Sequence, residues 1–198
     1  FRYLDAGDGD DTVRITTNRD DIFNVDFLDG GSGNDQIIVR RDNSLNPYGR
    51  GIGAGIDNWT SLIKNFETIT LAGGHNITLG NQAAGSGENI EIDSTNSSGT
   101  FSVDSSFQGN ITFKGSGGTD NVTLGSGNDT ITLNAGDDVI TAGAGNDTID
   151  GGAGIDIAIF SGNYADYSIS SSISGLFETI TISGTDGTDT LTNIETLR

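Results

Sequence analysis

Five nine-residue units run without a gap from residue 115 to residue 159, and they constrain this chain more than any other feature of its sequence. The units read GSGGTDNVT, LGSGNDTIT, LNAGDDVIT, AGAGNDTID and GGAGIDIAI. Each has a glycine-rich first half, an aspartate at its sixth position and an apolar residue at its eighth. Glycine permits a sharp bend, and the second half alternates inward and outward as a strand must. The sequence therefore predicts a repeated unit of one tight turn and one short strand.

The repeat resembles the G-G-x-G-x-D-x-U-x signature of the RTX, or hemolysin-type calcium-binding, family. The resemblance implies an all-β fold, a parallel β-roll or β-helix solenoid with calcium ions in the turns. The chemistry is compatible, because calcium takes six to eight oxygen ligands and each turn offers backbone carbonyls and one aspartate. Asn134 stands where the pattern has its second glycine, and asparagine is among the few other residues that tolerate the left-handed conformation.

The repeat fixes where the candidate ligands lie. If each unit is half a coil, alternate units share one side of the roll, and an ion needs two adjacent turns. Three ions are then expected within residues 115–160, between Asp120 and Asp138, between Asp138 and Asp156, and between Asp129 and Asp147. The turn glycines of these sites are Gly125, Gly127, Gly136, Gly143, Gly145, Gly152 and Gly154. Parallel strands lie about 4.8 Å apart, so without metal each side would hold a column of like charges, and calcium is expected to be part of the fold.

Residues 1–39 are expected to form a second, shorter calcium block. AGDGDDTVR at residues 6–14 and GGSGNDQII at residues 30–38 both match the motif. The candidate ligands there are Asp11 and Asp35, and the turn glycines are Gly7, Gly9, Gly31 and Gly33. Asp20 or Asp21 would lie on the half-coil between them. One further ion is expected between Asp11 and Asp35, although they are 24 residues apart instead of 18 and the excess must bulge out.

Apolar residues recur in i, i+2 pairs along residues 76–114 and into the strict repeats. The pairs are Ile77 with Leu79, Ile90 with Ile92, Phe101 with Val103, Ile111 with Phe113, Val122 with Leu124, and Ile131 with Leu133. Each pair predicts a short strand with two inward side chains. The connections between residues 80 and 109 have no aspartate at the ligand position. Residues 76–114 are therefore expected to be metal-free β-helix coils held by apolar stacking.

Residues 40–75 are expected to be an insert with a closing segment that covers the apolar coils; a partner-binding site is the alternative. Four of the nine basic residues fall here, and they are Arg40, Arg41, Arg50 and Lys64. The spacing of Trp59, Leu62, Ile63 and Phe66 predicts a short helix that Asp57 could cap.

Residues 161–198 are expected to form a C-terminal cap of the β-hairpin type on the main roll of residues 115–160. Gly184 to Gly187 would make a hairpin turn. The residues expected to plug the open end are Phe160, Tyr164, Tyr167, Phe177 and Ile180. The segment resembles those that commonly follow RTX arrays. Residues 189–197 also resemble residues 61–69, which indicates an internal duplication.

Composition excludes several classes of function. With 28 Asp and Glu against 9 Lys and Arg, the net charge is −19, and nucleic-acid binding is not expected. The chain has no cysteine and a single histidine, His75, which excludes disulfides and the usual zinc sites. No G-x-S-x-G or G-K-[ST] motif is present, and no catalytic residues are expected, so the chain is not expected to be an enzyme. No apolar run is long enough for insertion into a membrane.

The RTX resemblance implies a protein that is secreted through type I export and folds on meeting extracellular calcium. We expect a structural module of a secreted adhesin, S-layer or other bacterial cell-surface protein, with a surface, polysaccharide or self-assembly partner. The alternative is the C-terminal folding or secretion module of a type I-secreted hydrolase, toxin or polysaccharide-modifying enzyme. Since the chain begins within the repeat pattern, the rest of a longer parent chain is also an expected partner.

Overall fold

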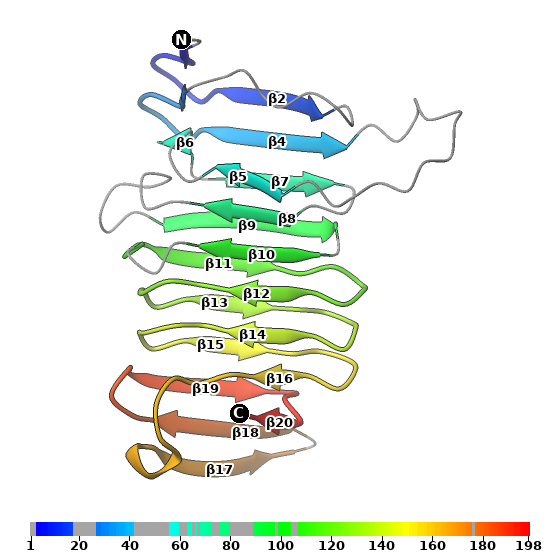
Figure 1. Ribbon diagram of the computed structural model, residues 1–198, viewed down its shortest axis with the longest axis vertical. Helices are drawn as coiled ribbons and strands as arrows, with labels where there is room; N and C mark the ends of the chain where they lie inside the picture. Colours follow the sequence, from blue (N-terminus) through cyan, green and yellow to red (C-terminus); the bar gives the residue numbers. More distant parts are fainter. Residues whose placement is uncertain are drawn as a thin grey trace.

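A computed structural model describes residues 3–17, 27–41, 56–59, 63–64, 66, 68–72, 76–79, 89–97, 99–103, 107–175 and 177–198. Across these residues the chain is nearly all β, with one short 3₁₀ helix, η1 (Tyr164–Asp166), and no α-helix. Parallel coils stack into a β-solenoid whose two long sheets face each other (Figure 1). The fold class predicted from the repeats is confirmed.

Two long sheets form the faces of the solenoid. The ten-stranded sheet contains, in spatial order, β17 (Ser168–Ser174), β18 (Phe177–Ser183), β19 (Thr188–Thr192), β15 (Thr148–Asp150), β13 (Thr130–Thr132), β11 (Asn110–Lys114), β9 (Asn89–Asn96), β7 (Thr68–Ala72), β4 (Gln36–Arg41) and β2 (Thr12–Thr17). The seven-stranded sheet contains β20 (Thr196–Leu197), β16 (Ile157–Ala158), β14 (Val139–Thr141), β12 (Asn121–Thr123), β10 (Thr100–Val103), β8 (Asn76–Leu79) and β5 (Ile56–Trp59).

A third, three-stranded sheet of β1 (Tyr3–Asp5), β3 (Phe27–Asp29) and β6 (Ile63–Lys64) lies at the N-terminal end. The ten-stranded sheet runs from β2 to β17 and contains strands from each of the five predicted segments.

The strand register confirms that units two apart lie on the same side. Thr130 pairs with Thr148 in β13 and β15, and Asn121 pairs with Val139 in β12 and β14, each 18 residues on. The turns that lead into β12, β14 and β16 therefore stack along one side, called here the β12 edge. The turns that lead into β13, β15 and β19 stack along the other, the β13 edge (Figure 1).

The core is a single column of apolar side chains between the two sheets. The inward pairs of β9 to β13 are buried as the i, i+2 spacing predicted, from Ile90 with Ile92 to Ile131 with Leu133. For Ile77 and Leu79 the structure gives the backbone register, in which they pair with Phe101 and Val103. The second inward position then shrinks from Leu133 to Ala142, so the core narrows towards the C-terminal end.

The predicted helix near residues 57–66 is wrong. Residues Ile56–Trp59 form β5, which pairs in parallel with β8, and Ile63–Lys64 form β6, which pairs with β3. An extended segment can join the edges of existing sheets and satisfy its backbone hydrogen bonds there, which outweighs the weak helical spacing of its apolar residues. Arg50, Leu62 and most of the insert lie outside the described residues, as do Asp20, Asp21 and His75.

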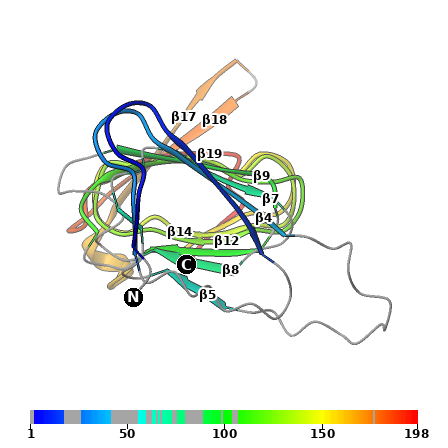
Figure 2. The same cartoon turned by 90° about the horizontal axis from the view of Figure 1, so that it is seen from above.

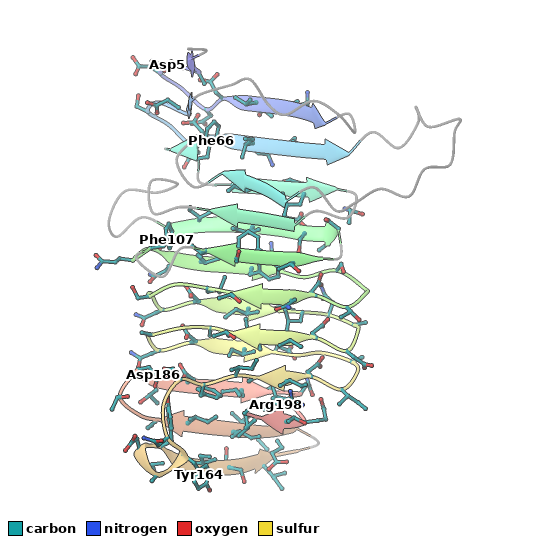
Figure 3. The ribbon with its side chains drawn as sticks, in the orientation of Figure 1. Asp5, Phe66, Phe107, Tyr164, Asp186 and Arg198 are labelled. Carbon is teal, nitrogen blue, oxygen red and sulfur yellow. The ribbon has the colours of Figure 1, made fainter. Side chains whose placement is uncertain are left out.

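The C-terminal cap is built from an antiparallel hairpin. β18 and β19 are antiparallel neighbours, and the amide of Gly184 donates to the carbonyl of Gly187 at 2.8 Å, so the predicted hairpin turn is confirmed. β17 adds to β18, and in Figure 2 this pair leans out of the ring of coils. Phe160, Tyr167 and Ile180 pack against the core as expected. Tyr164 does not, because η1 carries it outwards, where it is 82% exposed (Figure 3); the side chain of Phe177 is not described.

Candidate metal sites in the turns

The repeated aspartates are buried at the two edges of the solenoid. Of their surface, Asp138 and Asp156 expose 0% and Asp147 exposes 1%. Asp120, Asp129 and Asp35 are buried as well. A buried carboxylate is costly unless it is hydrogen-bonded and its charge is compensated, so both oxygens of each group need a partner.

One oxygen of each carboxylate is satisfied by the coil before it. The backbone amide of Asp120 donates to Oδ1 of Asp138 at 2.7 Å, and that of Asp138 donates to Oδ1 of Asp156 at 2.9 Å. On the β13 edge the amide of Asp129 donates to Oδ1 of Asp147 at 2.8 Å. Each column of aspartates is therefore also a hydrogen-bonded ladder that fixes the register of successive turns.

The other oxygen has no protein partner. Among the described residues, Oδ2 of Asp129, Asp138, Asp147 and Asp156 is buried without a hydrogen bond. The Asp156 oxygen faces back over its own turn, because a Cβ added at Gly151 would meet it at 2.6 Å. A buried, unpartnered carboxylate oxygen is the donor that a hard cation such as Ca²⁺ requires.

Asp120 differs from the other four aspartates of the main block. Its Oδ2 accepts hydrogen bonds from the amide and the hydroxyl of Ser116, at 2.8 and 3.0 Å. Ser116 occupies the second position of the unit, where the other units have glycine or Asn134. The turn between Asp120 and Asp138 thus offers one free carboxylate oxygen, whereas the two other predicted pairs offer two each.

The electrostatics of the columns require a counter-charge. Burial, and to a smaller extent the charge of Asp147, raises the pKa of Asp129 to about 7. Burial also raises the pKa of Asp138 to about 6, assisted by the charges of Asp120 and Asp156. Two unit charges about 4.8 Å apart repel by about 3 kcal/mol at an effective dielectric constant of about 20. That repulsion exceeds the net gain of about 1 kcal/mol from a typical hydrogen bond, so the ladder needs cations or protons.

The turn glycines adopt the conformation that brings successive turns close together. Nine of the predicted glycines have positive φ: Gly7, Gly9, Gly31, Gly33, Gly136, Gly143, Gly145, Gly152 and Gly154. Gly125 and Gly127, also predicted, lie outside that region. At Gly154, where φ is +147°, an added Cβ would lie 1.8 Å from the carbonyl oxygen of Gly136 in the coil before. Asn134 has φ of +72°, as the sequence predicted.

The N-terminal block has the same arrangement. Asp11 and Asp35 precede β2 and β4 on the β13 edge, and the Asp11 amide donates to Oδ1 of Asp35 at 2.9 Å. Oδ2 of Asp11 is buried and unpartnered. Asp35 is 1% exposed. The two predicted ligands are thus brought together in the same relation as Asp129 and Asp147.

The structure adds residues to each column that the repeat spacing did not indicate. On the β13 edge, the amide of Asp147 donates to Oδ1 of Asp189 at 2.9 Å, and Asp189 is buried with a pKa raised by burial to about 6. On the β12 edge, the amide of Asp156 donates to Oε2 of Glu195 at 2.7 Å. The sequence did contain a signal for the first, since GTDGTDTLT at residues 184–192 has the nonapeptide pattern except for Thr185 at the second position.

A second ladder runs beside the aspartates in the opposite sense. Here a side-chain oxygen accepts from the backbone amide of the following coil. The Asn146 amide donates to Oδ1 of Asn128, and the Thr188 amide donates to Oδ1 of Asn146, both at 2.8 Å. Asp137 does the same for Ile155 on the β12 edge at 2.9 Å. These residues occupy the fifth position of the unit, directly before the column aspartate. The side chain at position five therefore bonds to the following coil, and the aspartate at position six bonds to the preceding coil.

These residues fit a calcium site. Within the described part of the chain no group of three or more His, Cys, Asp or Glu side chains is arranged to hold a metal ion, so any ion depends on two column carboxylates together with turn carbonyls. The free oxygens, the buried like charges and the closely stacked turns all match what Ca²⁺ binding demands. No described helix is long and apolar enough to cross a membrane.

Comparison with known proteins agrees with this chemistry. A family model for the RTX calcium-binding nonapeptide repeat, in four copies, matches residues 25–44, 112–131 and 124–158. These ranges include Asp35 and all five aspartates of the main block. Searches of curated proteins and of solved structures found no match to the chain. The chain thus contains RTX calcium-binding nonapeptide repeats, folded as a β-solenoid.

Proposed function

We propose that this chain is a structural module that folds and stiffens when it meets calcium outside the cell, within a secreted adhesin, S-layer or other cell-surface protein. The observation that carries the proposal is the pair of buried aspartate columns, in which one oxygen of each carboxylate holds the adjacent coil and the other is free at Asp129, Asp138, Asp147 and Asp156. Calcium bound there stabilises only the folded chain, because the unfolded chain does not bring the turns together.

We place three ions within residues 115–160 and one between Asp11 and Asp35. The pairs Asp138 with Asp156 and Asp129 with Asp147 offer the most free oxygens, and the Asp120 pair offers fewer because of Ser116. Extracellular calcium modules commonly bind with Kd of about 10⁻⁴ to 10⁻³ M. Binding in that range leaves the columns empty in a calcium-poor cytosol and filled outside, which suits export of an unfolded chain.

A surface role is supported by the length of the solenoid beyond the repeats. β9, β10 and β11 continue both long sheets with buried apolar side chains, and the described residues directly before β10 and β11, Gly99 and Gly109, carry no carboxylate. A module that served export alone would not need these coils, whereas a spacer or assembly surface would. The module itself is proposed to have no enzymatic activity, and any catalysis in a parent protein would lie in other segments.

A calcium titration followed by far-ultraviolet circular dichroism and thermal melting tests the proposal. Each ion at about 100 times its Kd stabilises the fold by about 2.7 kcal/mol, and about 1 kcal/mol shifts Tm by about 2–4 °C in a chain of this size. We therefore expect Tm to rise by more than about 10 °C between chelator and 10 mM CaCl₂. Magnesium at the same concentration is the control and should do far less, because it is smaller and dehydrates reluctantly. An equal effect of both salts, or none, would contradict the proposal.

A further inference from the structure

β17 is the outermost strand of the ten-stranded sheet, at the C-terminal end of the solenoid (Figure 1). It pairs with β18 on one side, and no strand among the described residues pairs with its other side. All seven of its residues are exposed. β17 is longer than the usual strand of about five to six residues. Its free side therefore presents a row of backbone N–H and C=O groups with which another strand can pair.

β17 has none of the features that usually protect an edge strand. Its sequence, SISSSIS, contains no charged residue and no proline, although the chain has a net charge of −19. Its pairing with β18 is continuous from Ser168 to Ser174, with no bulge that would turn the strand away. Two copies of so acidic a chain repel each other, and this strand adds nothing to that repulsion.

The sequence of β17 is self-complementary in antiparallel pairing. SISSSIS reads the same in both directions, so a two-fold axis through Ser171 sets Ile169 opposite Ile173 of a second copy. The same axis sets Ser168 opposite Ser174 of the second copy. A symmetric dimer requires a surface that is complementary to itself in this way.

The two faces of such a pair of strands would also match. Ile169, Ser171 and Ile173 share one face of β17, because alternate residues of a strand point to the same side. Ile169 pairs with the buried Ile182 of β18, so this face continues the apolar face of the sheet. It is poorly covered, since Ile169 is 41% and Ile173 76% exposed. Pairing two copies would bring four isoleucines together on this face and leave serines on the other.

An apolar groove lies beside the exposed isoleucines. Its volume is about 160 Å³, and its lining includes Phe160, Tyr164, Ile169 and Ile182. In the antiparallel pair, Ile173 of the second copy is the direct neighbour of Ile169 and so lies at the rim of this groove. The second copy would thus bury apolar surface that the single chain leaves exposed.

We infer that β17 pairs antiparallel with β17 of a second copy of this chain, about a two-fold axis at Ser171, and so joins the two ten-stranded sheets end to end. The carboxylate of β18, Glu178, stands opposite Ile173. The Glu178 side chains of the two copies would be three strand spacings, at least about 14 Å, apart, which exceeds the Debye length of about 8 Å. The inference names a partner for the proposed surface module and rests on that function only because calcium is expected to fold the cap.

Sedimentation velocity of the full chain in 10 mM CaCl₂ tests the self-association. The interface is small, so we expect a Kd in the micromolar range or weaker, and the concentration series must extend to several hundred micromolar. Ser171→Lys sets two like charges opposite each other on the axis and should weaken the dimer at least about tenfold. Thr130→Lys is the matched control, with the same change of charge on an exposed residue inside the same sheet, and should keep the dimer.

Cysteine cross-linking tests the register, since the chain has no cysteine of its own. Ser171→Cys should form an intermolecular disulfide readily, because directly opposite residues have Cα atoms about 4.5–5.5 Å apart, within disulfide reach. Ser174→Cys is also exposed but should not cross-link to itself, because its counterpart lies six residues, about 20 Å, along the strand. A mixture of the Ser168→Cys and Ser174→Cys variants should cross-link, since those positions face each other.

The outcomes separate this inference from the proposed function. A chain that stays monomeric at every concentration, or a dimer that Ser171→Lys leaves intact, would overturn the inference, and a gain in Tm with calcium would still support the proposed function. Equal cross-linking of Ser171→Cys and Ser174→Cys would also overturn it. If the chain dimerises as expected but calcium does not raise Tm, the proposed function fails and the inference stands.

Discussion

Four of the column aspartates, Asp129, Asp138, Asp147 and Asp156, have one carboxylate oxygen that accepts a backbone hydrogen bond and one that is buried without a partner. Oδ1 of Asp138 accepts the amide of Asp120, and Oδ2 has no protein partner. The hydrogen bond stabilises the stacking of the turns, whereas the unpartnered oxygen and the buried charge destabilise it. On the proposed function, calcium reverses the second effect, and the two effects can be separated by substitution.

Asp138→Asn is expected to separate them. Asparagine retains Oδ1 for the Asp120 amide but lacks the buried charge, so in chelator the variant should melt no lower than the unaltered chain above about pH 6. The gain in Tm on adding calcium should fall by several degrees, because Asp138 is shared between two predicted ions. Asp137→Asn is the control, with the same change of charge on an exposed neighbour. An undiminished calcium gain in Asp138→Asn would show that Asp138 is not a ligand.

The raised pKa values predict opposite pH dependences with and without metal. The folded pKa of Asp129 is about 7 and those of Asp138 and Asp189 about 6, above the value of about 3.9 in an unfolded chain. The folded apo form thus binds protons more tightly than the unfolded chain. Its stability should be greatest in acid and should fall as pH rises from about 4 to 7. With calcium, the free energy of unfolding should instead rise over this range, because the ion needs ionised carboxylates.

Urea unfolding at intervals from pH 4.5 to 8, in chelator and in calcium, measures both curves. We expect the separation between them to widen as pH rises. Parallel curves would mean that the buried aspartates do not exchange protons for calcium.

At the scale of the element, the nonapeptide turn is a stacking unit as well as a ligand. Gly154→Ala should be severely destabilising, because its Cβ would meet the Gly136 carbonyl oxygen at 1.8 Å. Gly162→Ala is a matched control, since Gly162 also has positive φ, +100°, but an added Cβ would meet nothing closer than 4.0 Å. The control should lose about 1 kcal/mol or somewhat more from backbone strain, and Gly154→Ala at least about 2 kcal/mol beyond that. Urea unfolding in calcium compares them; equal losses would mean that the turns do not stack this closely.

The element scale also shows what the sequence could and could not predict. Asp129 and Asp147 were found because strict spacing places them on the same edge. Asp189 follows Asp156 by 33 residues instead of 9, since β17, β18 and η1 intervene, and its turn has Thr185 at a glycine position. The nine-residue spacing cannot predict that a strand rejoins the same sheet after so long an intervening segment. The helix expected near Trp59 failed for a related reason, because sheet pairing with β8 is a tertiary effect.

The resemblance between residues 61–69 and 189–197 has a structural counterpart at those of their residues that the structure describes. Thr68 donates to the carbonyl of Asp35, and Thr196 to that of Asp156, both at 3.1 Å. Phe66 and Ile194 are both buried beside these turns. In each segment the threonine amide thus bonds to the carbonyl of the aspartate in the coil before it. This similarity agrees with the predicted internal duplication. Glu195 accepts the Asp156 amide there, and its counterpart Glu67 lies outside the described residues.

At the scale of the whole molecule, apolar packing and the aspartate columns complement each other along the solenoid. The coils of β9 and β11 have two large inward side chains per strand, Ile90 with Ile92 and Ile111 with Phe113. In the later strict repeats the second becomes Ala142 after Ile140 and Gly151 after Ile149. Replacing one large side chain by alanine or glycine gives up about 1.5–3 kcal/mol of apolar burial. A bound calcium ion can contribute a similar amount to the free energy of unfolding, so on the proposed function the ions compensate for the smaller core.

We therefore expect the stability of the fold to depend unevenly on calcium along the chain. Residues 115–198 contain both main columns and the hairpin cap stacked on them. The coils of β9, β10 and β11 instead depend on apolar contacts such as that of Phe101 with Phe113, whose ring centroids are 5.1 Å apart. Chelation should therefore loosen the C-terminal half first.

Amide hydrogen exchange followed by mass spectrometry, with calcium and with chelator, tests this most directly. We expect peptides from residues 115–198, including the amides of Asp129, Asp138 and Asp147 that donate to the next carboxylate, to lose protection on chelation by at least an order of magnitude. Peptides from residues 89–113 should lose much less. Equal protection of residues 115–198 in calcium and in chelator would contradict the central claim that calcium is part of this fold.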